Sequence, residues 1–152
     1  MNNRTLEALR RLLFFSRAEA ATLVAACAKK PHGVTDRSWL WWEQGTRPIP
    51  AHVSDKIRYL ATWRNDLIEA ASRRKKINLV WFDSLDDWQA LNHPPILFRP
   101  YLSAVASLAA LRPQLPVTAQ DKTGPDLVLA DAIALWLVYE KSLSGGRQQA
   151  DE

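Results

Sequence analysis

Arg37 lies where a guanidinium group could contact the edge of a base, in the first turn of a short predicted helix. Its N–H donors match the two acceptors that guanine presents in the major groove of DNA. Thr35 is a favourable N-cap for this helix, and Asp36 and Ser38 complete a first turn of short polar side chains. Gly45 predicts the end of the helix, because glycine readily adopts the left-handed conformation found there. The stretch therefore predicts a helix that inserts its N-terminal end into a DNA groove.

Two tryptophans predict how this helix is held in place. Trp39 and Trp42 are three residues apart and share one helical face, so they can be buried together against the domain. Leu40 and Trp41 then lie on the side of the helix that faces the DNA. Tryptophans could also stack on sugars or another ligand, but all except Trp41 occupy periodic apolar positions, which favours core packing for the other six.

A capped helix upstream supplies the partner that such a helix needs. Ser16 and Glu19 occupy the N-cap and third helical position of a capping box, and Ala20 and Ala21 allow a neighbouring helix to approach closely. A leucine stripe predicts a first helix over residues 5–14. Together these elements predict a helix-turn-helix. The alternative is an ordinary helical bundle with tryptophans in its core, which does not require the charge of this region.

The charge distribution favours a polyanionic partner for the first half of the chain. Residues 1–76 contain 15 Lys or Arg and 7 Asp or Glu, a net charge of +8, whereas residues 77–152 contain 5 and 9, a net charge of −4. Lys29 and Lys30, in the long turn before Thr35, are predicted to contact DNA phosphates. The basic run at 73–76 is more typical of a solvated helix end, where the helix macrodipole favours cations.

The second half of the chain predicts a mixture of helices and strands. A long helix over about residues 51–75 has an apolar side that only Arg64 interrupts. The pattern then predicts a strand at 77–82, a short helix from Ser84 to about Leu91, a second strand at 96–98 and a helix at 101–111. Three prolines and a glycine indicate a linker at 112–125, before a strongly apolar helix at 126–143 and a disordered tail from Ser144.

The second half is also the expected site of self-association. One recognition helix covers only a few base pairs, so two copies must act together on neighbouring major grooves. The first half is highly charged, whereas the helix at 126–143 is so apolar that it must pack on its own chain or on a partner. Trp81, Trp88 and Trp136 are therefore expected at the dimer contact.

No pattern typical of catalysis or metal binding is found. His32, His52 and His93 lie far apart and outside ligand spacing with Cys27. There is neither a glycine-rich phosphate loop nor a nucleophile elbow, so no enzyme, metal site or cofactor is expected. The single cysteine cannot form an internal disulfide, and no segment looks like a membrane span or a secretory signal. We therefore expect a cytoplasmic protein.

The same residues resemble those of a known family. Over residues 1 to about 111, the chain is similar to the anti-CRISPR-associated helix-turn-helix autorepressors of the second type and to their YdiL-like bacterial relatives. The most specific element is Arg-Ser-Trp-x-x-Trp-Glu-x-Gly, which begins at Arg37. The resemblance also rests on residues 6–13, 19–21 and 49–50, and individually weaker matches at 76–77, 85–86 and 101–106 continue it in the second half.

The resemblance implies a homodimer that binds an inverted repeat in the promoter of its own operon and represses it. Some family members also bind RNA of the same operon, so such RNA is a second expected partner. The family arginine that contacts DNA corresponds to Arg37. Leu40 replaces a polar family residue, so a base contact there becomes apolar, for example to a thymine methyl.

The expected fold is mainly α, with a lambda-repressor-like helix-turn-helix domain at residues 1–76. A small α+β dimerisation domain follows at 77–111, and the linker, apolar helix and tail occupy 112–152. The residues expected to contact DNA are Ser16, Arg17, Thr35, Asp36, Arg37, Ser38, Leu40, Trp41 and Arg47, with Lys29 and Lys30 on the backbone.

Two other functions fit the same sequence. One is the antitoxin of a toxin–antitoxin pair, whose apolar C-terminal helix would bind the toxin. The other is a protein-interaction module with a degenerate helix-turn-helix. A salt-dependent gel shift on the upstream DNA separates both DNA-binding functions from the interaction module, and the neighbouring gene separates the repressor from the antitoxin.

Overall fold

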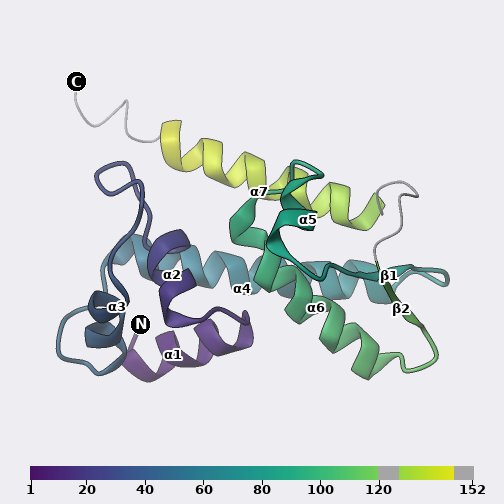
Figure 1. Ribbon diagram of the computed structural model, residues 1–152, viewed down its shortest axis with the longest axis horizontal. Helices are drawn as coiled ribbons and strands as arrows, with labels where there is room; N and C mark the ends of the chain where they lie inside the picture. The colour runs from purple at the N-terminus through teal and green to yellow at the C-terminus, as the bar shows by residue number, and fades with distance from the viewer. Residues whose placement is uncertain (120–126, 146–152) are drawn as a thin grey trace.

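The computed structural model describes residues 1–119 and 127–145, and within them the chain is mainly helical (Figure 1). A two-stranded parallel sheet completes the described fold. The helices are α1 (Asn3–Leu12), α2 (Arg17–Leu23), α3 (Asp36–Glu43), α4 (Ala51–Ser72), α5 (Leu85–Gln89), α6 (Phe98–Leu111) and α7 (Leu127–Gly145); a 3-10 turn, η1, spans Pro95–Leu97, and the strands are β1 (Leu79–Trp81) and β2 (Val117–Ala119).

The long helix α4 connects the two halves of the molecule. Figure 1 shows α1, α2 and α3 around its N-terminal half, with α6 and α7 on opposite sides of the remainder. Val53, Ile57 and Leu60 on α4 are buried. They belong to one cluster of buried apolar side chains that begins at Leu6 on α1 and extends to Trp136 on α7. This core therefore crosses both of the domain boundaries expected from the sequence.

Arg64, the one charged residue on the apolar side of α4, joins three helices. Its side chain is buried, and its Nε donates to the hydroxyl of Ser103 on α6 at 2.7 Å. The Ser103 hydroxyl in turn donates to the carbonyl of Leu12 at the end of α1. A second guanidinium nitrogen of Arg64 donates to Ser107. The interruption of the stripe is therefore a buried hydrogen-bonded connection between α4, α6 and α1.

Two expectations for the second half are wrong. Residues 96–98 do not form a strand, because Pro94 and Pro95 start a helical turn that leads directly into α6. The expected linker contains β2, which pairs with β1 in parallel, Leu79 opposite Val117 and Trp81 opposite Ala119. The intervening α5 and α6 form the long connection that a parallel pair requires. Residues 120–126 of the expected linker lie outside the described residues.

The apolar helix α7 packs on its own chain. The indole Nε1 of Trp63 on α4 donates to the carbonyl of Ala132 at 2.8 Å, and the rings of Tyr59 and Tyr139 stack at 3.5 Å. The helix continues to Gly145, so the expected disordered tail begins too early at Ser144, and residues 146–152 lie outside the described residues. Among the helices that the structure describes, none has both the length and the apolar character needed to cross a membrane.

Candidate nucleic-acid interface

Helix α3 exposes its N-terminal end, as the sequence predicts. The Thr35 hydroxyl caps the helix by accepting the backbone N–H of Ser38 at 3.2 Å. Asp36 and Arg37, in the first turn, are exposed, and Ser38 is half-buried. Gly45 follows the helix with a φ of +75°, the left-handed conformation expected at this end. The first turn of α3 thus presents short polar side chains together with one guanidinium.

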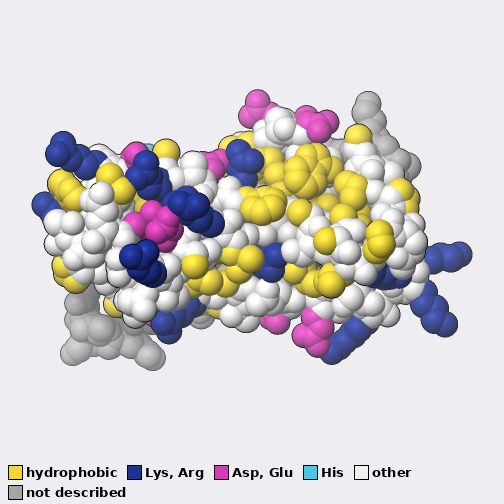
Figure 2. All heavy atoms as spheres, turned by 90° about the horizontal axis from the view of Figure 1, so that it is seen from below, with side chains coloured by type: hydrophobic (Ala, Val, Ile, Leu, Met, Phe, Trp, Pro, Cys, Tyr) yellow, Lys and Arg dark blue, Asp and Glu magenta, His cyan; other side chains and the backbone are white. Residues whose placement is uncertain are grey.

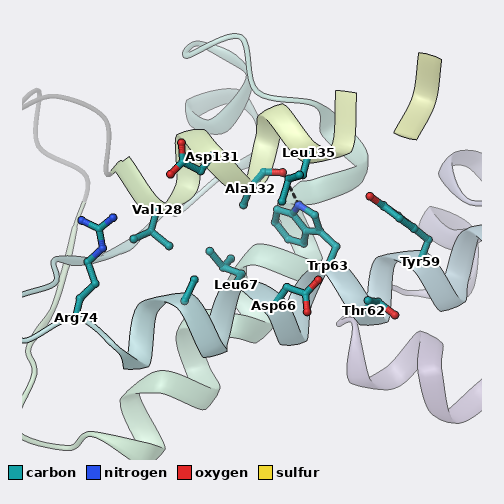
Figure 3. A pocket seen from close by; sticks show the side chains of 11 residues that line it. Tyr59, Thr62, Trp63, Asp66, Leu67, Arg74, Val128, Asp131, Ala132 and Leu135 are labelled. Carbon is teal, nitrogen blue, oxygen red and sulfur yellow. Dashed lines mark hydrogen bonds between the residues drawn. The ribbon is translucent and has the colours of Figure 1, made fainter. Parts of the chain in front are cut away.

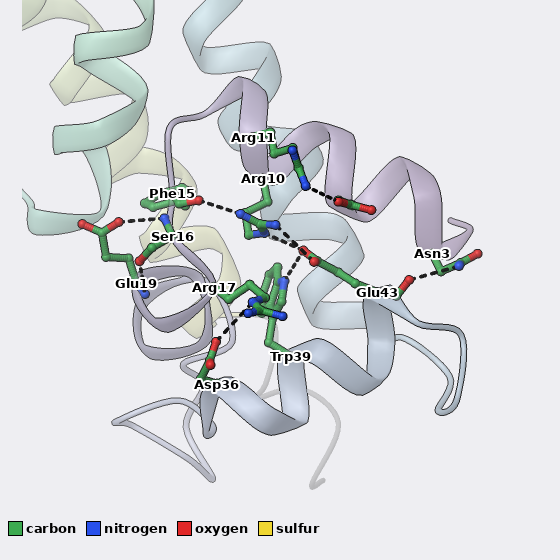
Figure 4. A network of polar contacts seen from close by, with 11 residues as sticks. Asn3, Arg10, Arg11, Phe15, Ser16, Arg17, Glu19, Asp36, Trp39 and Glu43 are labelled. Carbon is green, nitrogen blue, oxygen red and sulfur yellow. Dashed lines mark hydrogen bonds and ion pairs between the residues drawn. The ribbon is translucent and has the colours of Figure 1, made fainter.

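The opposite end of α3 is buried, and a charged network fixes it (Figure 4). Trp39 and Trp42 are buried and pack edge to face, with ring centroids 5.6 Å apart. The Glu43 carboxylate accepts hydrogen bonds from Arg10 of α1 at 2.5 Å and 3.2 Å, and from the Trp39 indole at 2.7 Å. Arg10 also donates to the backbone carbonyl of Phe15, just before α2. These contacts fix the orientation of α3 relative to α1 and α2.

Helix α2 lies beside the exposed end of α3. The capping box is present: Ser16 accepts from the backbone N–H of Glu19, and the Glu19 carboxylate accepts from the backbone N–H of Ser16. Arg17 forms an ion pair with Asp36 at 3.7 Å, which joins the first turns of α2 and α3. Arg99 of α6 pairs with Glu19 at 2.9 Å. Burial acts to raise the pKa of Glu19, but the hydrogen bonds from Ser16 and Arg99 outweigh it and lower that pKa.

The long turn between α2 and α3 presents two lysines. An isolated bridge between Cys27 and Lys30 closes its tip, and Lys29 and Lys30 are exposed. The base of the turn is held by Lys56 of α4, whose ammonium group donates to the carbonyl of Ala26 at 2.6 Å. The sequence analysis did not identify Lys56, because its spacing on α4 gives no indication of a contact with a turn 30 residues earlier.

Trp41 faces away from the buried pair but is covered by arginines. The guanidinium of Arg47 lies 3.8 Å from the Trp41 ring centroid, and that of Arg37 lies 5.5 Å from it. Such cation–π contacts hold the two arginines close to the exposed end of α3. Leu40 is half-buried and lines a surface hollow together with Arg11 and Arg17. The expected residues of α2, α3 and the segment after α3 therefore lie close together on one surface.

A family model matches the part of the sequence that forms this surface. The model of the Aca2/YdiL-like family matches residues 1–115, which is more than half of the chain. The chain belongs to the Aca2/YdiL-like family. The family resemblance seen in the sequence is therefore confirmed. A relative, the Aca2 repressor of Pectobacterium phage ZF40, is 30% identical over 96 residues, which cover 60% of this chain and 77% of the relative.

The Aca2/YdiL-like match covers all of the residues expected to contact DNA, and also Trp81 and Trp88. It does not include α7, which carries Trp136. Arg10 and Glu43, which the sequence analysis did not single out as a pair, both lie within the match. The sequence signal that could have identified this pair is one charged residue on each of two otherwise apolar helix faces, Arg10 on α1 and Glu43 on α3.

Two of the three tryptophans expected at a dimer contact are buried inside the chain. Trp88 and Trp136 are 0% and 1% exposed, so neither is accessible to a partner. Trp88 packs between Phe82 and Tyr101, and Trp136 packs against Tyr59. This corrects their expected role, because both side chains fill the core of a single chain. Trp81 is half-buried and is the one of the three that a partner can reach.

The described residues offer no arrangement of three or more His, Cys, Asp or Glu side chains that could hold a metal ion.

Proposed function

We propose that this protein is a DNA-binding transcriptional repressor in which α2 and α3 form a helix-turn-helix and α3 is the recognition helix. The observation that carries the proposal is the division of α3: its first turn, with Arg37, is exposed, while Trp39, Trp42 and Glu43 anchor the same helix in the core. A recognition helix requires this combination, since its N-terminal residues contact base edges and the rest must be rigidly supported. The similarity to an Aca2 repressor supports the proposal.

Basic side chains lie on the end of the molecule that carries the proposed recognition helix. Figure 2 shows Lys and Arg side chains among a few acidic ones over the end that holds α1, α2 and α3, and further Lys and Arg side chains at the opposite end. Arg17, Arg37 and Arg47 belong to that end and lie at or near the surface. We place the DNA backbone along it, with Lys29 and Lys30 contacting phosphates and Arg37 contacting a base.

Arg37→Ala is expected to weaken binding to the specific site by about 1–3 kcal/mol and to leave binding to random DNA nearly unchanged, because the guanidinium contacts a base edge. Fluorescence anisotropy with DNA from upstream of the protein's own gene, against a scrambled duplex, measures both affinities.

The contrasting variant is Lys29→Ala with Lys30→Ala. It should weaken both duplexes alike and lower the slope of log K against log salt by roughly one unit for each phosphate that is no longer neutralised. Equal losses on both duplexes for Arg37→Ala would show that Arg37 is a phosphate contact only.

We further propose that two copies act together on an inverted repeat in the promoter of the protein's own operon. Two α3 helices must then reach major grooves about 34 Å apart, which requires a rigid contact between the copies. Figure 2 shows apolar side chains gathered over the half of the molecule away from α1, α2 and α3. In that half, Trp81 is half-buried on β1 and Leu85 on α5 is exposed. We place the dimer contact there.

Trp81→Glu is expected to shift the protein from dimer to monomer, since a charged residue at an aromatic interface position costs about 2 kcal/mol or more. Sedimentation velocity over a range of protein concentrations measures the shift, and circular dichroism checks that the variant remains folded. The control is Leu137→Glu, which introduces the same charge at an exposed position on α7. If Leu137→Glu dissociated the dimer and Trp81→Glu did not, the contact would lie on α7 instead.

A further inference from the structure

A cavity lies between α4 and α7, away from the exposed end of α3 (Figure 3). Its volume is about 160 Å³. One wall comes from α7, which begins at Leu127, after the family match has ended at residue 115. The cavity therefore depends on a helix that the family match does not include, and the proposed DNA contacts do not use it.

The body of this cavity is apolar and partly aromatic. Trp63 and Leu67 line it from α4, and Val128 and Leu135 line it from α7. The hydrogen bond from the Trp63 indole to the carbonyl of Ala132 fixes the position of that ring (Figure 3). Leu135 remains 58% exposed beside it. Apolar cavities of about 150 Å³ are large enough to admit benzene, so this space fits one aromatic ring.

The edges of the cavity are acidic. Asp66 lines it from α4 and Asp131 from α7, so the two carboxylates come from opposite walls (Figure 3). Neither forms an ion pair with a Lys or Arg among residues 1–119 and 127–145. Arg74 is the basic residue of the lining, which leaves the cavity with a net charge of −1. Burial, and then the charge of Asp66, raise the pKa of the neighbouring Tyr59, so its ring is neutral.

From this combination we propose that the cavity binds a small organic cation, namely an amine attached to an apolar body of about one aromatic ring. The ring would occupy the space between Trp63, Leu67 and Val128. The ammonium group would lie at the edge of the cavity on the side of Asp66, where this carboxylate and the faces of aromatic rings attract a positive charge, while Asp131 on the opposite wall adds to the negative potential. This site goes beyond the proposed repressor function and does not depend on it.

Three probes of one skeleton test the charge requirement: 2-phenylethylammonium, 2-phenylethanol and 3-phenylpropanoate. Titration calorimetry with the full chain is expected to give the tightest binding for the cation, weaker binding for the alcohol and the weakest for the carboxylate. Both aspartates are exposed, so replacing both acids, Asp66→Asn with Asp131→Asn, should weaken cation binding about fivefold, near the upper limit for the loss of an exposed ion pair. The same change should leave the affinity for the alcohol unaltered.

Two further variants keep the test decisive. Asp55→Asn with Asp86→Asn removes the same charge from exposed sites outside the cavity lining, and should leave cation affinity unchanged. Ala70→Trp adds a ring at an exposed α4 position in the lining, and should abolish binding of both cation and alcohol while the protein remains folded. Equal affinities for the three probes, no cation binding at millimolar concentration, or unaltered cation affinity in the Asp66 and Asp131 variant would each overturn the proposal.

Discussion

Replacing Glu43 by alanine is expected to destabilise the protein by about 3–5 kcal/mol, because the Arg10 guanidinium would remain buried without its carboxylate partner. The side chains of Arg10 and Glu43 are only 11% and 6% exposed. Glu43 also accepts the indole N–H of Trp39, which would be left without a partner inside the core. Because this network fixes the buried end of α3, specific DNA binding should be lost together with stability. Urea unfolding followed by circular dichroism measures the change in the free energy of unfolding.

Two controls separate a buried network from ordinary loss of charge. Glu7→Ala removes the partner of Arg11 in an exposed pair on α1, and should cost no more than about 0.5 kcal/mol. The double variant Arg10→Met with Glu43→Leu removes both buried charges, and should cost much less than Glu43→Ala alone, since no unpaired charge remains. If Glu43→Ala were as mild as Glu7→Ala, the network would not be what anchors α3.

The sequence predicted those features of the fold and site that depend on near neighbours in the chain. The N-caps at Ser16, Thr35 and Ser84 are present, because a hydroxyl and a backbone N–H two or three residues later are sufficient to form each one. The shared face of Trp39 and Trp42 follows from helical spacing alone. The predicted bounds of the first helix differ from the observed ones by only two residues, because Asn2 caps the helix earlier than expected.

Contacts between distant parts of the chain were not predictable in this way. The Arg10–Glu43 pair joins residues 33 apart, and neither helix shows which charge the other will present. The parallel pairing of β2 with β1 requires α5 and α6 between them, and the three prolines and the glycine of residues 112–125 indicated a linker instead. Trp88 and Trp136 were interpreted as dimer contacts because spacing identifies an apolar face but not whether that face is covered by the same chain or by another.

Replacing Gly33 by alanine is expected to lower the free energy of unfolding by about 3–5 kcal/mol, at the upper end of the range for single substitutions. Gly33 has a φ of +75°, which by itself costs an alanine about 1–2 kcal/mol. A Cβ atom there would also lie 2.0 Å from the carbonyl oxygen of Ala21 and 2.7 Å from that of Thr22. Both are backbone atoms at the C-terminal end of α2, so no side-chain rotation can relieve the overlap.

Gly45 provides a matched control for this prediction, because it has the same φ of +75° but more space. The nearest atom to a Cβ at Gly45 is the Asn3 side-chain nitrogen, at 3.5 Å. Gly45→Ala should therefore lower the free energy of unfolding only by the conformational part, about 1–2 kcal/mol.

The turn at Gly33 also sets the path from α2 to α3, since the N–H of Val34 donates to the Ala21 carbonyl at 2.9 Å. Gly33→Ala should consequently reduce DNA affinity even at temperatures where the protein remains folded, whereas Gly45→Ala should not. Equal losses of unfolding free energy in the two variants would show that the turn moves away from α2 without cost.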